Sequence, residues 1–372
     1  MAEAVEEILT KAVGGDAGAW DLAGEIPLDL LHTLGAQGIL CAEVASEWGG
    51  LGLTGTENGR MTAHAGSLCS SLRSVMTSQG MAAWTIQRFG DQSQRAAYLP
   101  RLTGGEIAAV CFSEPQAGSD LSAISTEITE VIEVTEQGDE LVLTGEKVWA
   151  TAAAYADLLV VIAKFGQSAA AVVVPASAEG VTVTRIPATT GCRAAGHSDV
   201  RLDSVRLPRQ ALLAGSRLPV TMLVTMALTY GRLSVAWGSV GMLRACLASC
   251  GEHVQNRQQF GQPLIEHQLV ARHLAELYVA EQTATLTCEQ ASRSWTEKAP
   301  SMVADAVLAK YVASGNAARG AATAMQVMAS VAARDGHVVA RAYRDAKLME
   351  IIEGTSEISQ LILARRALEG TL

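Results

Sequence analysis

The sequence of 372 residues is poor in aromatic side chains, at 4 %, and in charged side chains, at 18 %. Apolar residues still make up 49 %, which is typical of a folded globular chain and excludes an intrinsically disordered one. There is no excess of positive charge either, since the net charge is −10 at pH 7. Binding to nucleic acid needs a basic surface, so we expect no nucleic-acid partner.

The sequence also shows no pattern typical of a signal peptide or a membrane-spanning segment. The N-terminal stretch MAEAVEEILTKAV is acidic and amphipathic, without the basic and apolar regions of a signal peptide. The most apolar stretch, ADLLVVIAKFGQSAAAVVV, is divided by Lys164 and Gly166 into pieces of strand length. We expect a cytoplasmic protein without membrane insertion.

Cysteine pairs and histidine pairs with metal-site spacing are absent. The seven cysteines form no CxxC motif, and an odd number in an intracellular chain is typical of reduced thiols. Cys246 and Cys250 lie one helical turn apart and are expected to be small packing residues. None of the seven histidines forms HxxxH or HExxH, so no metal site is expected.

Three regions differ in their hydrophobic pattern. Residues 1–109 have apolar residues at spacings of three and four, which predicts helices. Residues 110–216 contain short β-branched runs separated by Gly, Asp, Pro or Ser, with no room for crossover helices, which predicts an antiparallel sandwich or barrel. Residues 217–372 carry long apolar stripes typical of a four-helix bundle. The predicted fold is mainly α with a central β domain.

One nucleotide-binding pattern is misleading. The segment GLGLTG, residues 50–55, matches GxGxxG, but a dinucleotide site needs a preceding strand and a surrounding βαβ unit. The flanking sequence has helical periodicity, so a turn between helices is the better interpretation.

The segment MEIIEGTSEI, residues 349–358, places Glu353 between two isoleucines and Gly354. One interpretation is a solvated residue at a helix end. The other is a catalytic base whose basicity rises because the isoleucines keep it partly dry. Gly354 lets the chain bend, Thr355 or the following serine can cap a new helix, and Glu357 in its first turn suits the helix dipole.

Four separated stretches resemble motifs of the flavin-dependent acyl-CoA dehydrogenases, in the order of that family. They are AAVCFSEPQAGSDLSAI (108–124), GEKVWAT (145–151), NRQQFGQPLIEHQLV (256–270) and YRDAKLMEIIEGTSEI (343–358). Weaker likeness fills the gaps, so the resemblance spans nearly the whole chain. It implies dehydrogenation of an acyl thioester, in which a base removes the α-proton and the β-hydrogen leaves as hydride to N5 of FAD.

The resemblance assigns most of the site to the cofactor. Trp149 is implied to lie on the flavin ring with the Thr151 hydroxyl near N5, on one face of a strand because side chains alternate. Ala152 stands where the family usually has Asn or Gly. Arg257 is implied to pair with the FAD pyrophosphate of a neighbouring subunit, which makes the protein a homodimer or homotetramer. The complete set of implied FAD-binding residues is Val110, Phe112, Ser113, Trp149, Thr151, Arg257, Phe260, Gln268, Gln326, Thr355 and Glu357.

The resemblance makes Glu353 the base, with Ser119, Arg232 and Gly354 on the substrate side. It also implies that the backbone N–H of Glu353 and a ribityl hydroxyl of FAD hold the thioester carbonyl. Some branches of the family carry the base one residue before the helical arginine. That position is Gly231 here, so it cannot supply a carboxylate.

One motif departs from the family. The glycine-rich Q-x-x-G-G-x-G appears as QVMASVA, residues 326–332, with Ala329, Ser330 and Ala332 where glycines would let the backbone approach the cofactor. The overall likeness resembles the acyl-carrier-protein dehydrogenases that make hydroxymalonyl or methoxymalonyl extender units for polyketides. This branch implies a short pocket with polar groups for a small polar acyl group, presented on CoA or a carrier protein.

Partners and alternatives follow from the same resemblance. The implied electron acceptor is an electron-transfer flavoprotein. An acidic carrier protein would be met by local arginines, for which Arg193, Arg201 and Arg206 are candidates, with ordinary surface charge as the alternative. Three other functions stay open: an ordinary short-chain fatty acyl-CoA dehydrogenase, an oxygen-using oxidase or monooxygenase on the same scaffold, and a non-enzymatic degenerate scaffold.

Overall fold

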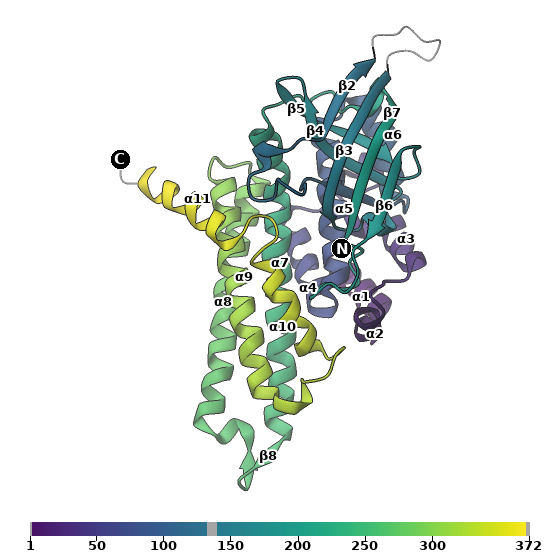
Figure 1. Ribbon diagram of the computed structural model, residues 1–372. Helices are drawn as coiled ribbons and strands as arrows, with labels where there is room; N and C mark the ends of the chain where they lie inside the picture. The colour runs from purple at the N-terminus through teal and green to yellow at the C-terminus, as the bar shows by residue number, and fades with distance from the viewer. Residues whose placement is uncertain (1, 132–139, 370–372) are drawn as a thin grey trace.

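The computed structural model describes residues 2–131 and 140–369. A group of helices, a β sheet and a bundle of long helices follow one another along the chain (Figure 1). The fold class expected from the sequence, mainly α with a central β domain, is confirmed. The first helices are α1 (Ala2–Val13), α2 (Ala17–Ala23), α3 (Leu28–Ala36), α4 (Gly55–Leu68), α5 (Ser70–Phe89) and α6 (Gln92–Thr103).

The GLGLTG segment forms the turn that leads into α4. Thr54 accepts a hydrogen bond from the Glu57 backbone N–H, and the Glu57 side chain accepts one from the Thr54 N–H. This capping box satisfies free N–H groups at the start of a helix, which accounts for the local sequence without any nucleotide.

The central sheet has the strand order β1-β4-β2-β3-β7-β6, and β5 pairs with β4. Its strands are β1 (Ala108–Cys111), β2 (Glu127–Val131), β3 (Glu140–Ala150), β4 (Leu158–Phe165), β5 (Ser168–Pro175), β6 (Val181–Arg185) and β7 (Ser198–Pro208). The sheet is mixed, because β4 runs parallel to both β1 and β2. A parallel pair needs a long crossover, which is usually a helix. Here the antiparallel β2–β3 hairpin lies within the connection, so the expectation of a wholly antiparallel sheet missed these two pairings.

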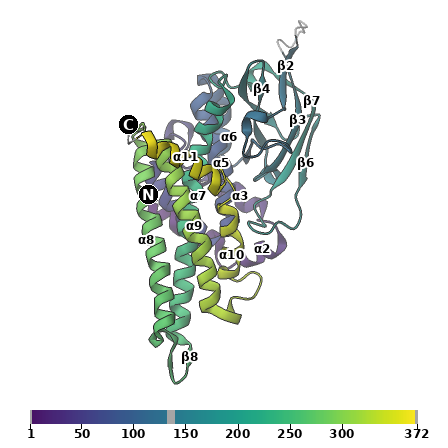
Figure 2. The same ribbon diagram turned by 60° about the vertical axis from the view of Figure 1, so that its left-hand side comes forward.

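The C-terminal helices are α7 (Val220–Asn256), α8 (Gln268–Thr296), α9 (Met302–Met328), α10 (Val338–Met349) and α11 (Ser356–Glu369). A short hairpin, β8 (Gln258–Gln259) and β9 (Gln262–Pro263), joins α7 to α8 at the end of the bundle away from the sheet (Figures 1 and 2). Of the described helices, α7 is the one that is long and apolar enough to cross a membrane, but 72 % of its apolar window is buried. Since it packs against α4, α5, α8, α9 and α10, it is the central helix of the core.

Candidate active site

The chain reverses between α10 and α11 at two successive residues with left-handed backbone. Gly354 has φ 97°, as the sequence predicts for a bend, but Glu353 also has φ 56°. A left-handed conformation costs a non-glycine residue about 1–2 kcal/mol. Thr355 then caps α11, since its hydroxyl accepts from the Ile358 N–H at 3.4 Å, and Glu357 lies in the first turn. The predicted cap is confirmed, and Glu353 sits at the strained point of the turn.

The Glu353 carboxylate is buried against α7 and α5. Its Oε2 atom has no hydrogen-bond partner. A Cβ atom added to Gly231 would lie 2.5 Å from this Oε2 and 2.7 Å from Met81 Sδ. Burial raises the pKa of Glu353 to about 7, against the opposing charges of the nearby cations. Of the two isoleucines expected to keep the carboxylate dry, Ile351 is 49 % exposed and does not fit that role, whereas Ile352 is partly buried against the core of the helical bundle.

Two buried cations hold the backbone of this turn. Arg232 Nε donates to the Glu353 carbonyl at 3.0 Å. Lys310 Nζ donates to the carbonyls of Gly354, at 2.7 Å, and Glu350, at 3.1 Å. The final carbonyls of a helix lack intrahelical partners, so a lysine here both caps α10 and fixes the turn. Burial lowers the pKa of Lys310 to about 8. Sequence reasoning missed Lys310, whose only signal was a lysine within an apolar helical stripe.

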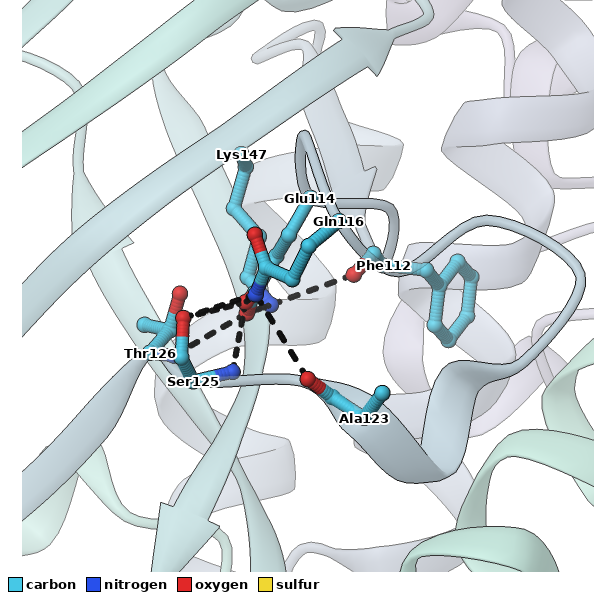
Figure 3. Close-up of polar contacts among 7 residues, drawn as sticks. All are labelled: Phe112, Glu114, Gln116, Ala123, Ser125, Thr126 and Lys147. Atoms are coloured by element: carbon cyan, nitrogen blue, oxygen red, sulfur yellow. Dashed lines mark hydrogen bonds and ion pairs between the residues drawn. The ribbon is translucent and has the colours of Figure 1, made fainter.

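The segment between β1 and β2 is anchored by a buried ion pair (Figure 3). Lys147 Nζ lies 2.6 Å from Glu114 Oε1 and donates to the Phe112 carbonyl at 3.1 Å. Glu114 Oε2 accepts from Gln116 Nε2 at 2.7 Å and from the Ser125 hydroxyl at 2.9 Å. Burial opposes ionisation of Glu114, but Lys147 and the other donors outweigh it and hold the pKa at about 2. The network fixes the backbone while the Phe112 ring points away from it.

Three other predicted residues, Val110, Ser113 and Ser119, belong to the same region. Val110 is buried and its N–H donates to the Ser78 hydroxyl at 3.2 Å. The Ser113 carbonyl accepts from the Val148 N–H at 2.9 Å, which ties the segment to β3. Ser119 is exposed, beyond the anchored part of the loop.

Trp149 and Thr151 are not related by strand alternation, contrary to the sequence expectation. The β3–β7 register shifts between Lys147 and Ala150, Trp149 has φ 56°, and Thr151 lies in the turn after the strand. Trp149 is 56 % exposed. Ala152 has φ 65°, which gives a physical reason for the Asn or Gly of the family at this position, since both tolerate left-handed backbone.

His197 connects Thr151 to the interior. Its Nδ1 lies 3.1 Å from the Thr151 hydroxyl, and its ring centroid lies 5.9 Å from that of Trp149. The Nε2 atom is buried without a partner, and burial lowers the pKa of His197 to about 4. The ring is therefore neutral at pH 7. The sequence reasoning did not select this histidine.

The third family motif, residues 256–270, lies far from Glu353 within one chain. Arg257 directly follows α7, Phe260 lies in the β8–β9 hairpin with 96 % of its side chain exposed, and Gln268 begins α8. Figure 1 shows this hairpin at the opposite end of the bundle from the sheet. One chain therefore does not bring these three residues together with Trp149 and Thr151.

The altered glycine motif ends α9. Gln326 is exposed, Ala332 is buried, and Ser330 is exposed. Ala329 has φ 51° and ψ −134°, a conformation that suits glycine. The glycine of the family is thus replaced at a position whose backbone still has the glycine conformation.

The arginines considered for a carrier protein already have acidic partners. Arg193 lies 3.8 Å from Asp21 and 3.6 Å from Asp335. Two further pairs are Arg201 with Asp203 at 3.8 Å and Arg206 with Glu140 at 2.8 Å. These pairs reduce the net positive charge that the three arginines present, and their role in docking stays a prediction.

Comparison with known families gives matches along the chain. The model described as "Acyl-CoA dehydrogenase, N-terminal domain" matches residues 1–106, the middle-domain model matches residues 109–205, and the C-terminal-domain model matches residues 221–368.

Individual relatives cover nearly the full length. "Probable acyl-CoA dehydrogenase YngJ" of Bacillus subtilis is 30 % identical over 99 % of this chain and 97 % of its own. The human mitochondrial short-chain specific acyl-CoA dehydrogenase is 28 % identical over 91 % of this chain and 82 % of its own. A solved structure titled as FkbI, for biosynthesis of the methoxymalonyl extender unit of the polyketide Fk520, is 58 % identical. It superposes with a TM-score of 0.92 over 98 % of this chain and 99 % of that chain.

Proposed function

Because the chain belongs to the acyl-CoA dehydrogenase family and is thus an oxidoreductase, we propose that it dehydrogenates an acyl thioester with Glu353 as the base. The observation that carries this proposal is the buried Glu353 Oε2 without a hydrogen-bond partner. An acid that has no structural partner and is held in a strained turn is available to a substrate. Its pKa of about 7 is suited to proton transfer near neutral pH.

Different residues of the chain position the carboxylate and keep it dry next to the α-carbon of the substrate. Arg232 and Lys310 fix the turn, so that the carboxylate is aimed without being hydrogen-bonded itself. The Oε2 atom is buried and lies so close to Gly231 that an added Cβ would be 2.5 Å away, so water is kept from it. A fixed, partly dry carboxylate removes an α-proton more readily than a hydrated one, because no solvent shell must be reorganised.

FAD is the proposed cofactor, and the described residues fit it. Trp149 offers a large exposed aromatic face beside the Thr151 hydroxyl, and the anchored backbone of residues 110–113 lies next to them. When bound, FAD would accept the β-hydrogen as a hydride. The strained Ala329, like Ala152, is a position where the match fits less well.

A homodimer or homotetramer is part of the same proposal. Phe260 is 96 % exposed and belongs to the β8–β9 hairpin, which lies at the end of the bundle away from the sheet, whereas Trp149 is part of β3 in that sheet. If Arg257, Phe260 and Gln268 contact FAD as the family resemblance implies, they must contact the cofactor of another subunit. Exposed apolar side chains on α8, such as Tyr278 and Leu286, support an interface between copies.

We further propose that the acyl group is small, polar and delivered on a carrier protein, for polyketide extender-unit synthesis. The support is the 58 % identity to FkbI over almost the whole length of both chains. Electron-transfer flavoprotein is the proposed acceptor. Ordinary short-chain fatty acyl-CoA oxidation is the second candidate, favoured by the likeness to the human short-chain enzyme.

Anaerobic flavin reduction tests the proposal. The purified holoenzyme is mixed with butyryl-CoA, octanoyl-CoA and a small hydroxyacyl group loaded on its carrier protein. Fast bleaching of the flavin by the carrier-bound group supports the carrier proposal, and fast bleaching by the fatty acyl-CoAs alone refutes it in favour of the second candidate. No bleaching by any thioester refutes the proposed chemistry, and rapid reoxidation by air would instead favour an oxidase.

The base is tested with Glu353→Gln, which keeps the volume of the side chain. Loss of a general base typically lowers the rate about 100- to 10,000-fold. Glu357→Gln, on the exposed face of α11, is the comparison: it should weaken the retention of FAD, and the protein that keeps its flavin should keep most of the reduction rate. Reduction of Glu353→Gln at the wild-type rate would show that another group removes the proton.

A further inference from the structure

We infer that His197 is a positioning residue, which holds the Thr151 hydroxyl so that its proton points toward N5 of the bound flavin. This inference rests on the proposed function, since it assumes that FAD lies against Trp149 and Thr151. His197 directly precedes β7 and lies outside the four motifs that carry the family resemblance. It therefore adds a residue to the site that the resemblance does not assign.

The backbone fixes the place of the His197 ring. The Ala152 N–H donates to the Ala195 carbonyl at 3.0 Å, so the loop before β7 lies against the turn after β3. Gly196 has φ 66°, and a Cβ atom at this position would lie 2.6 Å from the ring of Tyr155. Glycine is the residue that tolerates both the left-handed backbone and the close approach. His197 thus follows directly on a tightly packed point of the chain.

The backbone of Thr151 is fixed separately. The Ser78 hydroxyl of α5 donates to the Thr151 carbonyl at 2.8 Å. Among the residues that the structure describes, His197 is the hydrogen-bond partner of the Thr151 hydroxyl, with 3.1 Å between Nδ1 and the oxygen. The imidazole therefore acts on the direction of this hydroxyl, whereas the location of the residue depends on other contacts.

The segment around His197 also holds the neighbouring aromatic residue. The ring centroids of His197 and Trp149 lie 5.9 Å apart, with 60° between the ring planes. Asp199, two residues further on, accepts from the Trp149 N–H at 3.3 Å through Oδ1. Trp149 and Thr151 are the two residues proposed to meet the flavin ring, and both are held by this one segment.

The protonation of the ring decides what the hydroxyl can offer. Burial and the positive charge of Arg73 lower the pKa of His197 to about 4, so the imidazole carries a single proton at neutral pH. Its Nε2 atom is buried without a partner. With the proton on Nε2, Nδ1 would accept the proton of the Thr151 hydroxyl, and a buried N–H group would remain unpaired, which is costly.

With the proton on Nδ1, the imidazole donates to the Thr151 oxygen. The single hydroxyl proton must then point elsewhere, because a hydroxyl has one proton to donate. N5 of oxidised flavin carries no proton and is an acceptor, so the hydroxyl can donate to it. This tautomer gives two hydrogen bonds in sequence where the other gives one, and we assign it to His197 in the holoenzyme.

The first test compares the absorbance of oxidised flavin in purified holoenzymes. His197→Leu removes the hydrogen bond at similar side-chain volume, so its visible flavin band should shift in the same way as that of Thr151→Val. His197→Asn should restore most of the wild-type band, because its amide nitrogen can take the place of Nδ1 and donate. His64→Leu is the matched control, since His64 Nε2 lies 2.8 Å from the Thr10 hydroxyl, between α4 and α1, and it should leave the band unchanged.

The second test is a double-mutant cycle on anaerobic flavin reduction. The substrate is butyryl-CoA or the carrier-bound hydroxyacyl group, whichever bleaches the wild type faster. His197→Leu should lower the maximal rate by about 10-fold, as loss of one hydrogen bond provides, with KM within about twofold of wild type. The double variant His197→Leu/Thr151→Val should be within about twofold of Thr151→Val alone, because the imidazole acts through that hydroxyl.

Two outcomes refute the inference: a wild-type flavin band and rate in His197→Leu, or effects of the two substitutions that multiply in the double variant. If His197→Leu does not retain FAD, His197→Gln is measured against the same expectations, because its longer amide reaches the place of Nε2 and leaves the Thr151 hydroxyl unpaired. Failure of the proposed function looks different. In that case no thioester bleaches the wild type, whereas the comparison of oxidised flavin bands still decides the role of His197.

Discussion

Replacing Glu353 by Gln should make the protein more stable at alkaline pH while it abolishes proton abstraction. In the folded protein the pKa of Glu353 is about 7, against an ordinary value of 4.5. The folded state therefore binds this proton more tightly than the unfolded state. Ionisation opposes folding, with an effect that is absent below about pH 4.5 and complete above about pH 7.

The magnitude follows from the difference in pKa. A pKa of about 7 in the folded protein, in place of 4.5, corresponds to about 3 kcal/mol at pH 8. With an unfolding entropy of about 2.1 cal/mol/K per residue, a chain of 372 residues would show a difference of about 4 °C in melting temperature. The Gln amide group introduces an unpaired N–H group. This lowers the stability of the variant by about 1 kcal/mol at every pH. This constant term changes the difference in melting temperature equally at every pH, so the dependence of that difference on pH is unaffected.

The assay is the melting temperature of both holoproteins between pH 4.5 and pH 8.5. The difference, variant minus wild type, should rise by about 4 °C over this range, mostly below pH 7. Glu357→Gln is the control, because hydrogen bonds from its own backbone N–H and from Thr355 lower the pKa of that exposed carboxyl, so no such rise is expected. A difference that stays flat across the range would refute the assignment of burial as the dominant influence on Glu353.

Four further outcomes are expected. Gly231→Ala would place a Cβ atom 2.5 Å from Glu353 Oε2 and should displace the carboxylate, lowering the rate of flavin reduction by about 100-fold with flavin retained; a near wild-type rate would show that the side chain can move without loss. Lys310→Met removes a cation that lowers the pKa of Glu353, so the rising limb of kcat/KM against pH should move upward from about 7, and a downward shift would contradict this. Ala329→Gly should raise the free energy of unfolding by about 1 kcal/mol, because relief of the left-handed strain exceeds the added chain entropy. Ala322→Gly on the exposed face of α9 should lower it by about 1 kcal/mol, and denaturant unfolding of both variants checks the pair.

The order of helices, sheet and bundle could be predicted from local periodicity, because each pattern depends on residues close together in the chain. The Thr355 cap and the bend at Gly354 were predictable for the same reason. The relation of Trp149 to Thr151 was not, since a register shift on β3 interrupts the alternation that the sequence implies. Lys310 and His197 were also beyond the sequence, because their roles depend on contacts between distant segments. Lys310 of α9 binds the turn after α10, and His197 of the loop before β7 lies beside Thr151.

The contact between Gly231 and the Glu353 carboxylate bears on how the base could change its place during evolution. The space beside α7 holds one carboxylate, because even a methyl group on residue 231 would overlap Glu353 Oε2. A chain that gained an acid at 231 while keeping Glu353 would crowd two like charges into that space, and one of them would stay protonated. The catalytic base therefore cannot move from residue 353 to residue 231 by single substitutions that each leave an active enzyme. Such a move requires a paired substitution or passage through an inactive ancestor, so the two arrangements should persist as separate lineages.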